Sequence, residues 1–579
     1  MNVLGLHYGH HDSSVTLVRD GRIIASAAEE RFNHQKHYSG FPMSALSYCL
    51  SAGHVSMKDI DEVAIPTASP YDDKLALILG RKSIGKLAFA QYAPEMGMKD
   101  YARFAALTVV KRLHGLVEEG MPLYEKVFPF PKSRPILSVD HHVAHAASAY
   151  YTSGFQDRCL VMTADGSGDA LSMTVWLGEK GKLKKLLKIG NDGSLGYFYS
   201  MVTEALGWWI GDGEGKTMGL APYGKIDSVK GKLDRFVPHF ENGRLVTTVN
   251  FGPVQAWHVP SGTVHWHFRD SSIIKRLVKR YGAENVAAEA QRKLEEEMVP
   301  LVMSWVKETG VKYLAAAGGI FLNVKMNQRL WEQGKLRKIH IYPDAGDGGL
   351  SGGAALYCYF TRHPEKKIPQ VGGAYFGPSY TDEEIEKVLS IRNIKAKKYN
   401  QNELIERVAD LLSTGKIIGW VQGRMEIGPR ALGNRSILMD PRKAKNKDII
   451  NARVKYREGF RPFCPSMTVA ASQKYLVNPM VSAAYMVVSF DVVPKMRNVI
   501  PAVTHVDGTA RPQIVTKEAN PLFHRLLTAF GKKTGVEVLL NTSFNIKGDP
   551  IVCTPSDALK CFVDTGLDYL VLGNYLIEK

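Results

Sequence analysis

The chain has 579 residues, of which 45% are hydrophobic and 23% charged, and it carries a formal net charge of +17. This length exceeds what one hydrophobic core organises, so we expect roughly two to four domains, and the composition excludes a disordered chain. The positive charge favours anionic partners such as phosphorylated small molecules, nucleic acid or acidic membranes, although a solvated basic surface explains it equally well.

The first residues, MNVLGLHYGHHDSSVTLV, lack the cationic segment and the long apolar core of a signal peptide. No apolar run approaches the roughly 20 residues that a membrane helix needs. The six cysteines are scattered and form no CxxC pair, so neither a disulfide framework nor a zinc ribbon is expected. We therefore expect a cytoplasmic protein with reduced thiols and no membrane contact.

The first predicted elements are extended. Residues 2–30 predict strands joined by a hairpin at Asp20 and Gly21. Residues 72–127 predict basic helices. Residues 157–176 repeat this strand–turn–strand pattern, with a glycine-rich acidic turn between two apolar strands.

The next elements are a helix and a broken strand. Residues 283–310 have the 3.6-residue period of an amphipathic helix. They lead into a strand that breaks at Gly318 and Gly319. The polar segment 361–373, rich in proline and glycine, is the best domain boundary, after which residues 374–579 alternate helices and strands.

Two acidic glycine turns lie between apolar strands, GHHDSS at 9–14 and ADGSGD at 164–169. Small residues there let backbone N–H groups approach a phosphate, and two such turns suggest the duplicated halves of an actin/hexokinase-type nucleotide clamp. The diglycine of AAGGIFLN is a third candidate contact, and ordinary tight turns are the alternative. The nucleotide-binding candidates are Asp165, Gly166, Gly168, Gly318, Gly319 and Asn323.

The stretch SVDHHVAHAASAYY places His141 and His145 four residues apart, on one face of a helix. With a carboxylate from PDAGDGG, Asp344 or Asp347, they suit an iron or zinc ion with open positions. The alternative is that His141 and His145 are buried structural residues without a metal. The four-residue spacing by itself favours this alternative. His142 should point away, because neighbours on a helix lie about 100° apart.

Arginines in glycine- and proline-flanked segments mark the C-terminal part. Arg430, Lys455, Arg461 and Arg511 suit a phosphate or a carbamate, because arginine binds oxyanions with two parallel hydrogen bonds. The alternative is a structural network of these arginines with Glu426 and Asp440.

These motifs match one family, in the same order along the chain. The N-terminal segments are GHHDSSVTLVRDGRIIASAAEERFNHQKH, HHVAHAASAYY, DGSGD, GKTMGLAPYG and AAGGIFLN. The C-terminal segments are GPRALGNRSIL, VKYREGFRPFCPS, DGTARPQ and NTSFN. With them the chain resembles the NodU/CmcH/TobZ-type O-carbamoyltransferases along essentially its whole length.

The resemblance implies an α/β (α+β) fold with two catalytic domains. Residues 1–365 are expected to form an actin/hexokinase-like (ASKHA) domain related to the universal tRNA threonylcarbamoyl transferase TsaD. A helical insertion at about 72–127 carries no family motif and is a candidate for acceptor choice. Residues 374–579 are expected to form a YrdC-like α/β domain.

The resemblance also implies a reaction. In such enzymes carbamoyl phosphate and ATP give a carbamoyl-adenylate in the YrdC-like domain. The carbamoyl group then passes to a hydroxyl of a small acceptor in the first domain, near a bound iron. The expected cofactors are therefore ATP with magnesium and a divalent metal, iron.

Residue roles follow from the same motifs. The resemblance assigns the metal to His141, His145 and Asp347. It assigns carbamoyl phosphate to Arg430, Lys455, Arg461, Arg511 and Asn541, and it gives catalytic roles to His11, Arg430 and Lys455.

Two alternatives remain at this point, a tRNA-modifying transferase of the same chemistry and a non-catalytic nucleotide-binding regulator. The charge fits tRNA, but the full-length similarity to small-molecule enzymes argues against it. We therefore expect ATP, carbamoyl phosphate and a small hydroxylated acceptor as partners, with neither membrane nor nucleic acid. A homodimer stays open, and the sequence does not identify the acceptor.

Overall fold

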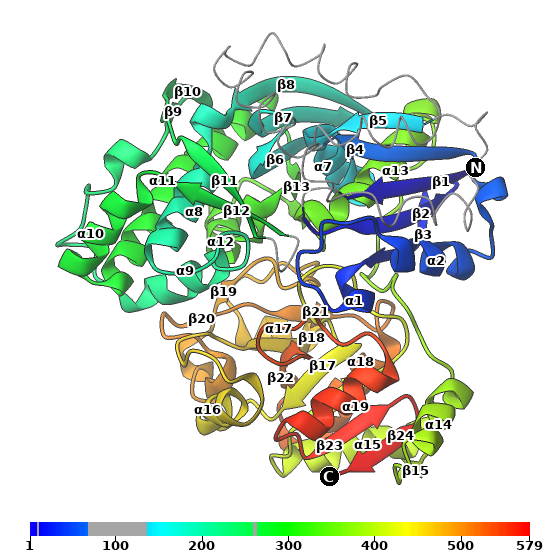
Figure 1. The fold of residues 1–579 in the computed structure, drawn as a ribbon. Coiled ribbons are helices and arrows are strands. Elements are labelled where there is room, and N and C mark those ends of the chain that lie inside the picture. Colours follow the sequence, from blue (N-terminus) through cyan, green and yellow to red (C-terminus); the bar gives the residue numbers. More distant parts are fainter. Residues whose placement is uncertain (9–10, 68–135, 259–262) are drawn as a thin grey trace.

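The computed structural model describes residues 1–8, 11–67, 136–258 and 263–579. The predicted basic helices at 72–127 lie outside these residues. In Figure 1 the elements coloured blue to green form the upper part of the molecule, and those coloured yellow to red form the lower part. Segment 363–381, which runs between the two parts, contains isolated bridges but no helix or strand.

The first sheet has the order β3-β2-β1-β4-β5. β1, β2 and β3 pair in antiparallel fashion, whereas β4 is parallel to both β1 and β5. Its strands are β1 (Asn2–His7), β2 (Ser14–Arg19), β3 (Arg22–Ala28), β4 (Glu62–Thr67) and β5 (Ile136–Asp140). Asp20 and Gly21 turn the β2–β3 hairpin with φ of 48° and 77°, as expected.

The second sheet repeats this topology, with the order β14-β13-β6-β7-β8. β6, β7 and β8 are antiparallel, and β13 is parallel to both β6 and β14. Its strands are β6 (Cys159–Gly168), β7 (Leu171–Glu179), β8 (Lys182–Gly190), β13 (Tyr313–Ala317) and β14 (Lys338–Ile341). The duplicated strand order agrees with the predicted actin/hexokinase-like class.

One predicted turn lies elsewhere. The segment 164–169 was expected to reverse the chain, but β6 continues to Gly168, and the reversal falls at Asp169 and Ala170, which have φ of 52° and 64°. A register shift between Ala164 and Gly168 interrupts the pairing with β7. Such a bulge bends a strand without ending it, and it re-aims the side chains that it contains.

Helices α7 (His141–Tyr150) and α13 (Leu350–Arg362) pack on each other, with α13 also on β1, β2 and β4 and α7 also on β6 and β13. The two backbones approach closely at Gly353, where a Cβ atom would lie 1.9 Å from the Ala144 carbonyl oxygen. The other helices in the described residues of this part are α1 (Glu30–Asn33), α2 (Met43–Ala52), α8 (Leu195–Ala205), α9 (Glu214–Leu220), α10 (Ser271–Tyr281), α11 (Ala283–Thr309) and α12 (Val324–Glu332). α11 and the strand-to-helix break after β13 match the prediction.

The C-terminal part is built on an eight-stranded mixed sheet, with the order β15-β24-β23-β16-β17-β22-β18-β21. Its strands are β15 (Lys397–Lys398), β16 (Ile418–Val421), β17 (Arg435–Met439), β18 (Cys464–Thr468), β21 (Gln513–Val515), β22 (Val538–Ser543), β23 (Tyr569–Leu572) and β24 (Tyr575–Glu578). The predicted mixed α/β class is therefore confirmed for both parts.

Helices cover this sheet, and α15 and α18 pack together over a core that includes Trp420 and Phe530. The helices are α14 (Asp382–Ile391), α15 (Gln401–Ser413), α16 (Lys445–Ile450), α17 (Val469–Tyr475), α18 (Pro521–Thr534) and α19 (Pro555–Asp564). Three two-stranded ribbons complete the described strands: β9 (His239–Glu241) with β10 (Arg244–Thr247), β11 (Pro253–His258) with β12 (Thr263–Phe268), and β19 (Phe490–Asp491) with β20 (Thr509–Ala510).

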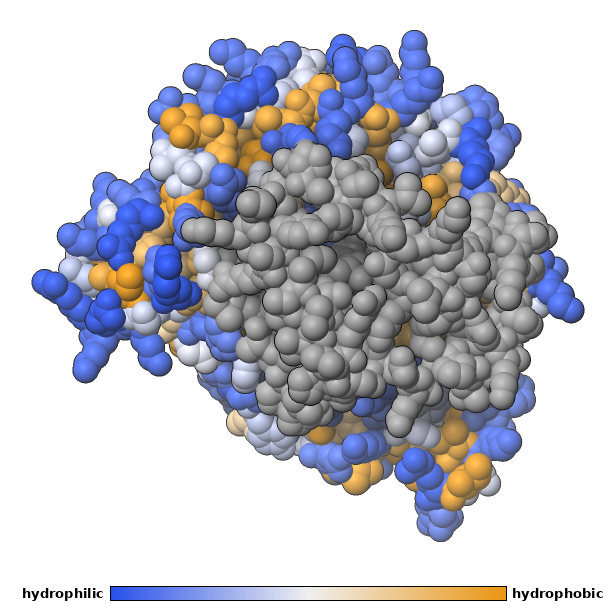
Figure 2. Space-filling view, turned by 45° about the horizontal axis from the view of Figure 1, so that its top comes forward, coloured by the Kyte–Doolittle hydropathy of each residue, from blue (hydrophilic) through white to orange (hydrophobic). Residues whose placement is uncertain are grey.

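In Figure 2 the coloured surface is largely hydrophilic, and hydrophobic residues gather in smaller patches between the hydrophilic ones. Among the described helices, none combines the length and the apolar composition needed to cross a membrane.

Candidate functional site

Helix α7 presents two histidines on one face. It begins at His141 because the carboxylate of Asp140 accepts hydrogen bonds from the backbone N–H groups of His142 and Val143, at 2.9 and 3.2 Å. The rings of His141 and His145 lie one turn apart, with centroids separated by 4.7 Å. Both side chains are buried.

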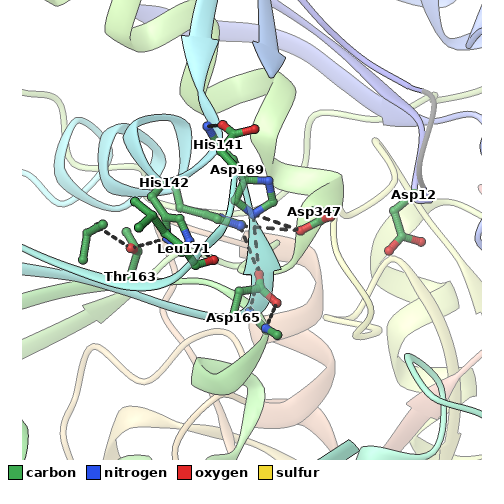
Figure 3. A network of polar contacts seen from close by, with 12 residues as sticks. Asp12, His141, His142, Thr163, Asp165, Asp169, Leu171 and Asp347 are labelled. Carbon is green, nitrogen blue, oxygen red and sulfur yellow. Dashed lines mark hydrogen bonds and ion pairs between the residues drawn. The ribbon is translucent and has the colours of Figure 1, made fainter. Parts of the chain in front are cut away.

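Two carboxylates from other elements meet these rings (Figure 3). His145 Nε2 lies 3.2 Å from Asp165 Oδ2 and 3.5 Å from Asp347 Oδ1. For His141 Nε2 the corresponding distances are 3.9 and 3.8 Å. One candidate ligand atom from each of the four residues falls within 4.8 Å of the others. Of the two carboxylates proposed from PDAGDGG, Asp347 joins this group, and Asp344 does not.

Asp165 is the member of this group that the sequence did not predict as a metal ligand. It was expected to bind nucleotide, yet the β6 bulge directs its carboxylate toward both histidines. Its place directly after the buried run CLVMTA, in a sheet whose strand β14 leads on to Asp347, is the pattern that could have indicated it.

His142 points away from this group, as expected (Figure 3). Its Nδ1 lies 2.7 Å from Thr163 Oγ1, and its Nε2 lies 3.0 Å from the Leu171 carbonyl oxygen. Burial, together with the neighbouring His141 and His145, lowers the pKa of His142 to about 3. This ring is therefore neutral and held within the core.

The surroundings of His141 and His145 fit a cation. None of their four ring nitrogens has a hydrogen-bond partner in the described part of the chain, although both rings are buried. Burial opposes a charge on Asp347, but His11 and His141 outweigh it and lower the pKa of that carboxyl. Two imidazoles and two ionised carboxylates form a donor set suited to a divalent metal.

His11 approaches the same group from the segment after β1. Its Nδ1 lies 2.8 Å from Asp12 Oδ2, and its Nε2 lies 3.3 Å from Asp347 Oδ2. Asp12 also binds His37 Nδ1, at 2.8 Å. Burial works against protonation of His11, but Asp347 and Asp12 outweigh it and raise its pKa to about 9. With 39% of its side chain exposed, His11 remains accessible from the adjoining cavity.

The predicted arginines converge in the C-terminal part, where Arg430, Arg461 and Arg511 line a common wall. Burial, together with the charges of Arg511, Arg461 and Arg457, lowers the pKa of Arg430 to about 9. The Nε atom of Arg430 is buried and has no partner among the described residues. Several guanidinium groups close together form a positively charged site, and a bound oxyanion would neutralise that charge.

Arg457 is a cavity-lining arginine that was not singled out from the sequence. Burial and the nearby charges of Arg461 and Arg511 lower its pKa to about 9. Its Nε donates to Asn451 Oδ1 at 3.1 Å, and its guanidinium lies over the ring of Phe463. Its position between Lys455 and Arg461 in VKYREGFRPF could have indicated it.

The proposed structural network is wrong, because its carboxylates have other partners. Glu426 accepts hydrogen bonds from the backbone N–H groups of Leu432, Asn434 and Arg435. Asp440 pairs with Arg442, at 2.7 Å.

Lys455 and Asn541 line the same wall but are largely engaged by the protein. Lys455 Nζ donates to the carbonyl oxygens of Ser543 and Asn545, at 2.7 and 3.0 Å, and so holds the loop after β22. Asn541 Nδ2 donates to Ser466 Oγ at 2.8 Å, whereas its buried Oδ1 has no partner among the described residues. That oxygen is free to accept from a ligand.

The nucleotide candidates separate into two groups. Asp165, Gly166, Gly319 and Asn323 line the cavity. The side chain of Asn323 also caps α12 and pairs with Gln291, at 2.9 and 3.0 Å.

The glycines at 168 and 318 serve close packing instead, and neither belongs to the cavity lining. A Cβ atom at 168 would lie 2.1 Å from the ring of His141, and one at 318 would lie 2.2 Å from the Ala164 carbonyl oxygen. The sequence pattern identified where the backbone is crowded but not which groups crowd it.

One cavity of about 990 Å³ connects two sets of residues. The first, which we call the histidine group, is His141, His145, Asp165 and Asp347. The second, the arginine wall, is lined by Arg430, Arg461 and Arg511. The cavity's lining from the N-terminal part includes His11, His141, Asp165 and Asp347, and its lining from the C-terminal part includes Arg430, Lys455, Arg457, Arg461, Arg511 and Asn541. A cationic region and a donor set suited to a metal therefore share one cavity.

Comparison with known proteins decides the family. Residues 2–356 match the model described as carbamoyltransferase N-terminus, and residues 409–579 match that described as carbamoyltransferase C-terminus. The chain belongs to the carbamoyltransferase family. The predicted resemblance and enzyme class are thereby confirmed.

Relatives cover from 76% to 100% of the carbamoyltransferase. Nodulation protein NolNO of Sinorhizobium fredii is 34% identical, over 98% of this chain and 79% of the relative. Nodulation protein NolO of Bradyrhizobium diazoefficiens is 36% identical, over 76% of this chain and 79% of the relative. An uncharacterised protein of Synechocystis is 34% identical, over 100% and 97% of the two chains.

Among solved structures, component A of the Acidaminococcus fermentans (R)-2-hydroxyglutaryl-CoA dehydratase shares 15% identity with the carbamoyltransferase at a TM-score of 0.33. It aligns with 63% of this chain over its own full length. Full-length HypF shares 12% identity at a TM-score of 0.30, over 64% of this chain and 56% of HypF.

Proposed function

We propose that this carbamoyltransferase is an ATP-dependent O-carbamoyltransferase that runs two reactions in its one cavity. Carbamoyl phosphate and ATP give carbamoyl-adenylate at the arginine wall, and the carbamoyl group then passes to a hydroxyl of a small acceptor at the histidine group. The observation that carries this proposal is the shared cavity, which joins an oxyanion-binding wall to a metal-binding donor set.

Donor activation uses the arginine wall. One water converts carbamoyl phosphate to carbamate and phosphate, and a carbamate oxygen attacks the α-phosphorus of ATP. The bond to pyrophosphate breaks, and carbamoyl-adenylate forms. Arg430, Arg461 and Arg511 supply charge and paired donors for these oxyanions, and Asn541 Oδ1 accepts from the carbamoyl amide. Lys455 acts by fixing the loop after β22.

Transfer takes place at the histidine group. The acceptor hydroxyl attacks the carbamoyl carbon, the bond to AMP breaks, and the hydroxyl proton goes to His11. A divalent cation held by His141, His145, Asp165 and Asp347 would polarise the carbonyl or lower the pKa of the hydroxyl, and iron is the metal that we propose. His11 can serve as the base once the charge of Asp347 is compensated, because Asp347 and Asp12 otherwise keep it protonated.

Placing both reactions in one cavity has a physical advantage. The adenylate carries a large nucleotide that both parts of the chain can bind. Binding of such a handle orients the carbamoyl carbon toward the acceptor, a contribution of up to roughly 7–11 kcal/mol in favourable cases. During transfer we place the AMP part of the adenylate against Gly166 and Gly319.

The test is mass spectrometry of the purified protein with ATP, carbamoyl phosphate and a panel of small hydroxylated metabolites. We expect pyrophosphate and a carbamoyl-adenylate mass without acceptor, and an added carbamoyl group on at least one acceptor. Arg430→Ala should abolish the adenylate, and Arg392→Ala, on an exposed turn after α14, is the matched control. ATP binding without carbamoyl-phosphate-dependent pyrophosphate release would instead support a non-catalytic regulator.

A further inference from the structure

One cysteine of the chain lies against an arginine inside the cavity. Cys464 begins β18, and its sulfur accepts hydrogen bonds from Nε and Nη2 of Arg511, at 3.0 and 2.8 Å. The residue is 4% exposed and belongs to the cavity lining, so small solutes reach it through the cavity. Two N–H groups of one guanidinium are therefore directed at this sulfur.

A second observation places a ligand beside this sulfur. Asn541 is the cross-strand partner of Cys464 in the β18–β22 pair. It is 1% exposed and lines the cavity, and its Oδ1 has no hydrogen-bond partner among the described residues. An unsatisfied buried oxygen next to arginines marks a place where a small polar molecule binds.

The remaining cysteines have a different environment. None of them belongs to the described cavity lining. Burial raises the pKa of all five, to about 12 for Cys358 and for Cys561. The other three thiols with raised pKa values are Cys49, Cys159 and Cys553. These thiols stay protonated and shielded, and they serve as internal controls for Cys464.

We propose that Cys464 is a modification site for hydrogen peroxide and that its oxidation blocks the anion-binding wall. The sulfur attacks one peroxide oxygen, an S–O bond forms and the O–O bond breaks. The thiol proton and the departing hydroxide leave as water. The sulfur is oxidised by two electrons to a sulfenic acid, and peroxide is reduced. The guanidinium of Arg511 donates to the oxygen that carries the developing negative charge.

Oxidation adds an oxygen to the wall beside the guanidinium of Arg511. That oxygen takes part of the space that an incoming phosphate or carbamate would occupy. This consequence rests on the proposed function of the arginine wall, whereas the modification itself does not. A thiol reductant should reverse the block, because a sulfenic acid is the reversible stage of cysteine oxidation.

The experiment exposes the full-length protein to low hydrogen peroxide with dimedone as a sulfenic acid trap, and maps the adducts by peptide mass spectrometry. We expect Cys464 to be labelled at least about tenfold faster than each of the other five cysteines. Inorganic phosphate should slow labelling of Cys464 alone. Arg511→Gln should slow it, and Arg511→Lys, which keeps the charge, should slow it less.

Phosphate binding, measured by calorimetry, tests the consequence. Peroxide should abolish binding in the wild-type protein, and dithiothreitol should restore it. In Cys464→Ala, binding before and after peroxide should be equal. Uniform labelling of all six cysteines, or labelling of Cys464 unaffected by Arg511→Gln in a variant with an unchanged melting temperature, overturns the modification site. Selective labelling without any phosphate binding leaves that site standing and overturns the donor assignment.

Discussion

Two histidines of α7 that lie three residues apart, His142 and His145, have opposite surroundings. The ring of His145 faces two carboxylates and has no hydrogen-bond partner in the described residues, whereas His142 is bound by Thr163 and by the Leu171 carbonyl. We therefore expect His145→Ala to lose the bound metal and His142→Ala to retain it. Losing the buried contacts of His142 should lower the stability of that variant by about 1–3 kcal/mol.

Elemental analysis of both variants, with thermal melting to confirm folding, decides this prediction. Metal lost from His142→Ala and kept in His145→Ala would assign the ion to the other face of α7. Unchanged metal in both folded variants would leave His141 and His145 as a structural pair.

The charge of His141 predicts how metal binding depends on pH. Burial disfavours protonation, but Asp347 and Asp165 outweigh it and raise the pKa of His141 to about 9 in the metal-free protein. A metal binds only the neutral imidazole. At pH 7 metal binding must therefore displace at least about one proton, and the affinity should rise as the pH increases toward 9.

Calorimetry in buffers of different ionisation enthalpy measures this proton release. Asp165→Asn should lessen it, because one of the two carboxylates that favour protonated His141 is lost. Metal binding with no proton exchange at pH 7 would show that His141 is already neutral and would contradict the electrostatic account.

At the level of elements, the positions of the proposed metal ligands depend on how α7 packs against α13. α7 supplies both histidines, and Asp347 lies directly before α13. Gly353→Ala would place a Cβ atom 1.9 Å from the Ala144 carbonyl, so the helices must separate. We expect a loss of about 3 kcal/mol in stability and weaker metal binding. Gly372→Ala, where no atom lies within 4 Å of the new Cβ, is the control.

Urea unfolding and metal titration of the two glycine variants test this dependence. Equal stability of Gly353→Ala and Gly372→Ala would show that α7 and α13 adjust without cost. A destabilised Gly353→Ala with unchanged metal affinity would show that the donor set does not depend on this contact.

The sequence predicts those features of the elements that a short segment specifies by itself. It does not predict the features that depend on pairing with a distant segment. The His141–His145 spacing is a helix period, so a single turn specifies it. The role of Asp165 arises from a bulge and from parallel pairing with a strand about 150 residues away, and no short pattern contains either. The turn expected at 164–169 failed for the same reason, because strand register is set by tertiary pairing.

At the scale of the whole molecule, one cavity joins residues that lie more than 280 positions apart, such as His141 and Arg430. From the sequence we expected these two residues on opposite sides of the domain boundary at 361–373, each with its own role. The sequence did not indicate how far apart they lie in the fold. Under the function that we propose, an adenylate formed at the arginine wall crosses this cavity to reach the histidine group.

A mixing experiment tests this arrangement. His145→Ala should form carbamoyl-adenylate but not transfer it, and Arg430→Ala should form none. In a mixture of the two, the intermediate arises in molecules whose histidine group is defective, while intact histidine groups lie in molecules that cannot make it. We therefore expect the mixture to yield far less carbamoylated acceptor than wild-type protein at the same concentration. Efficient product formation by the mixture would mean that the adenylate escapes freely, and loss of adenylate formation in folded His145→Ala would mean that the two ends of the cavity act as one site.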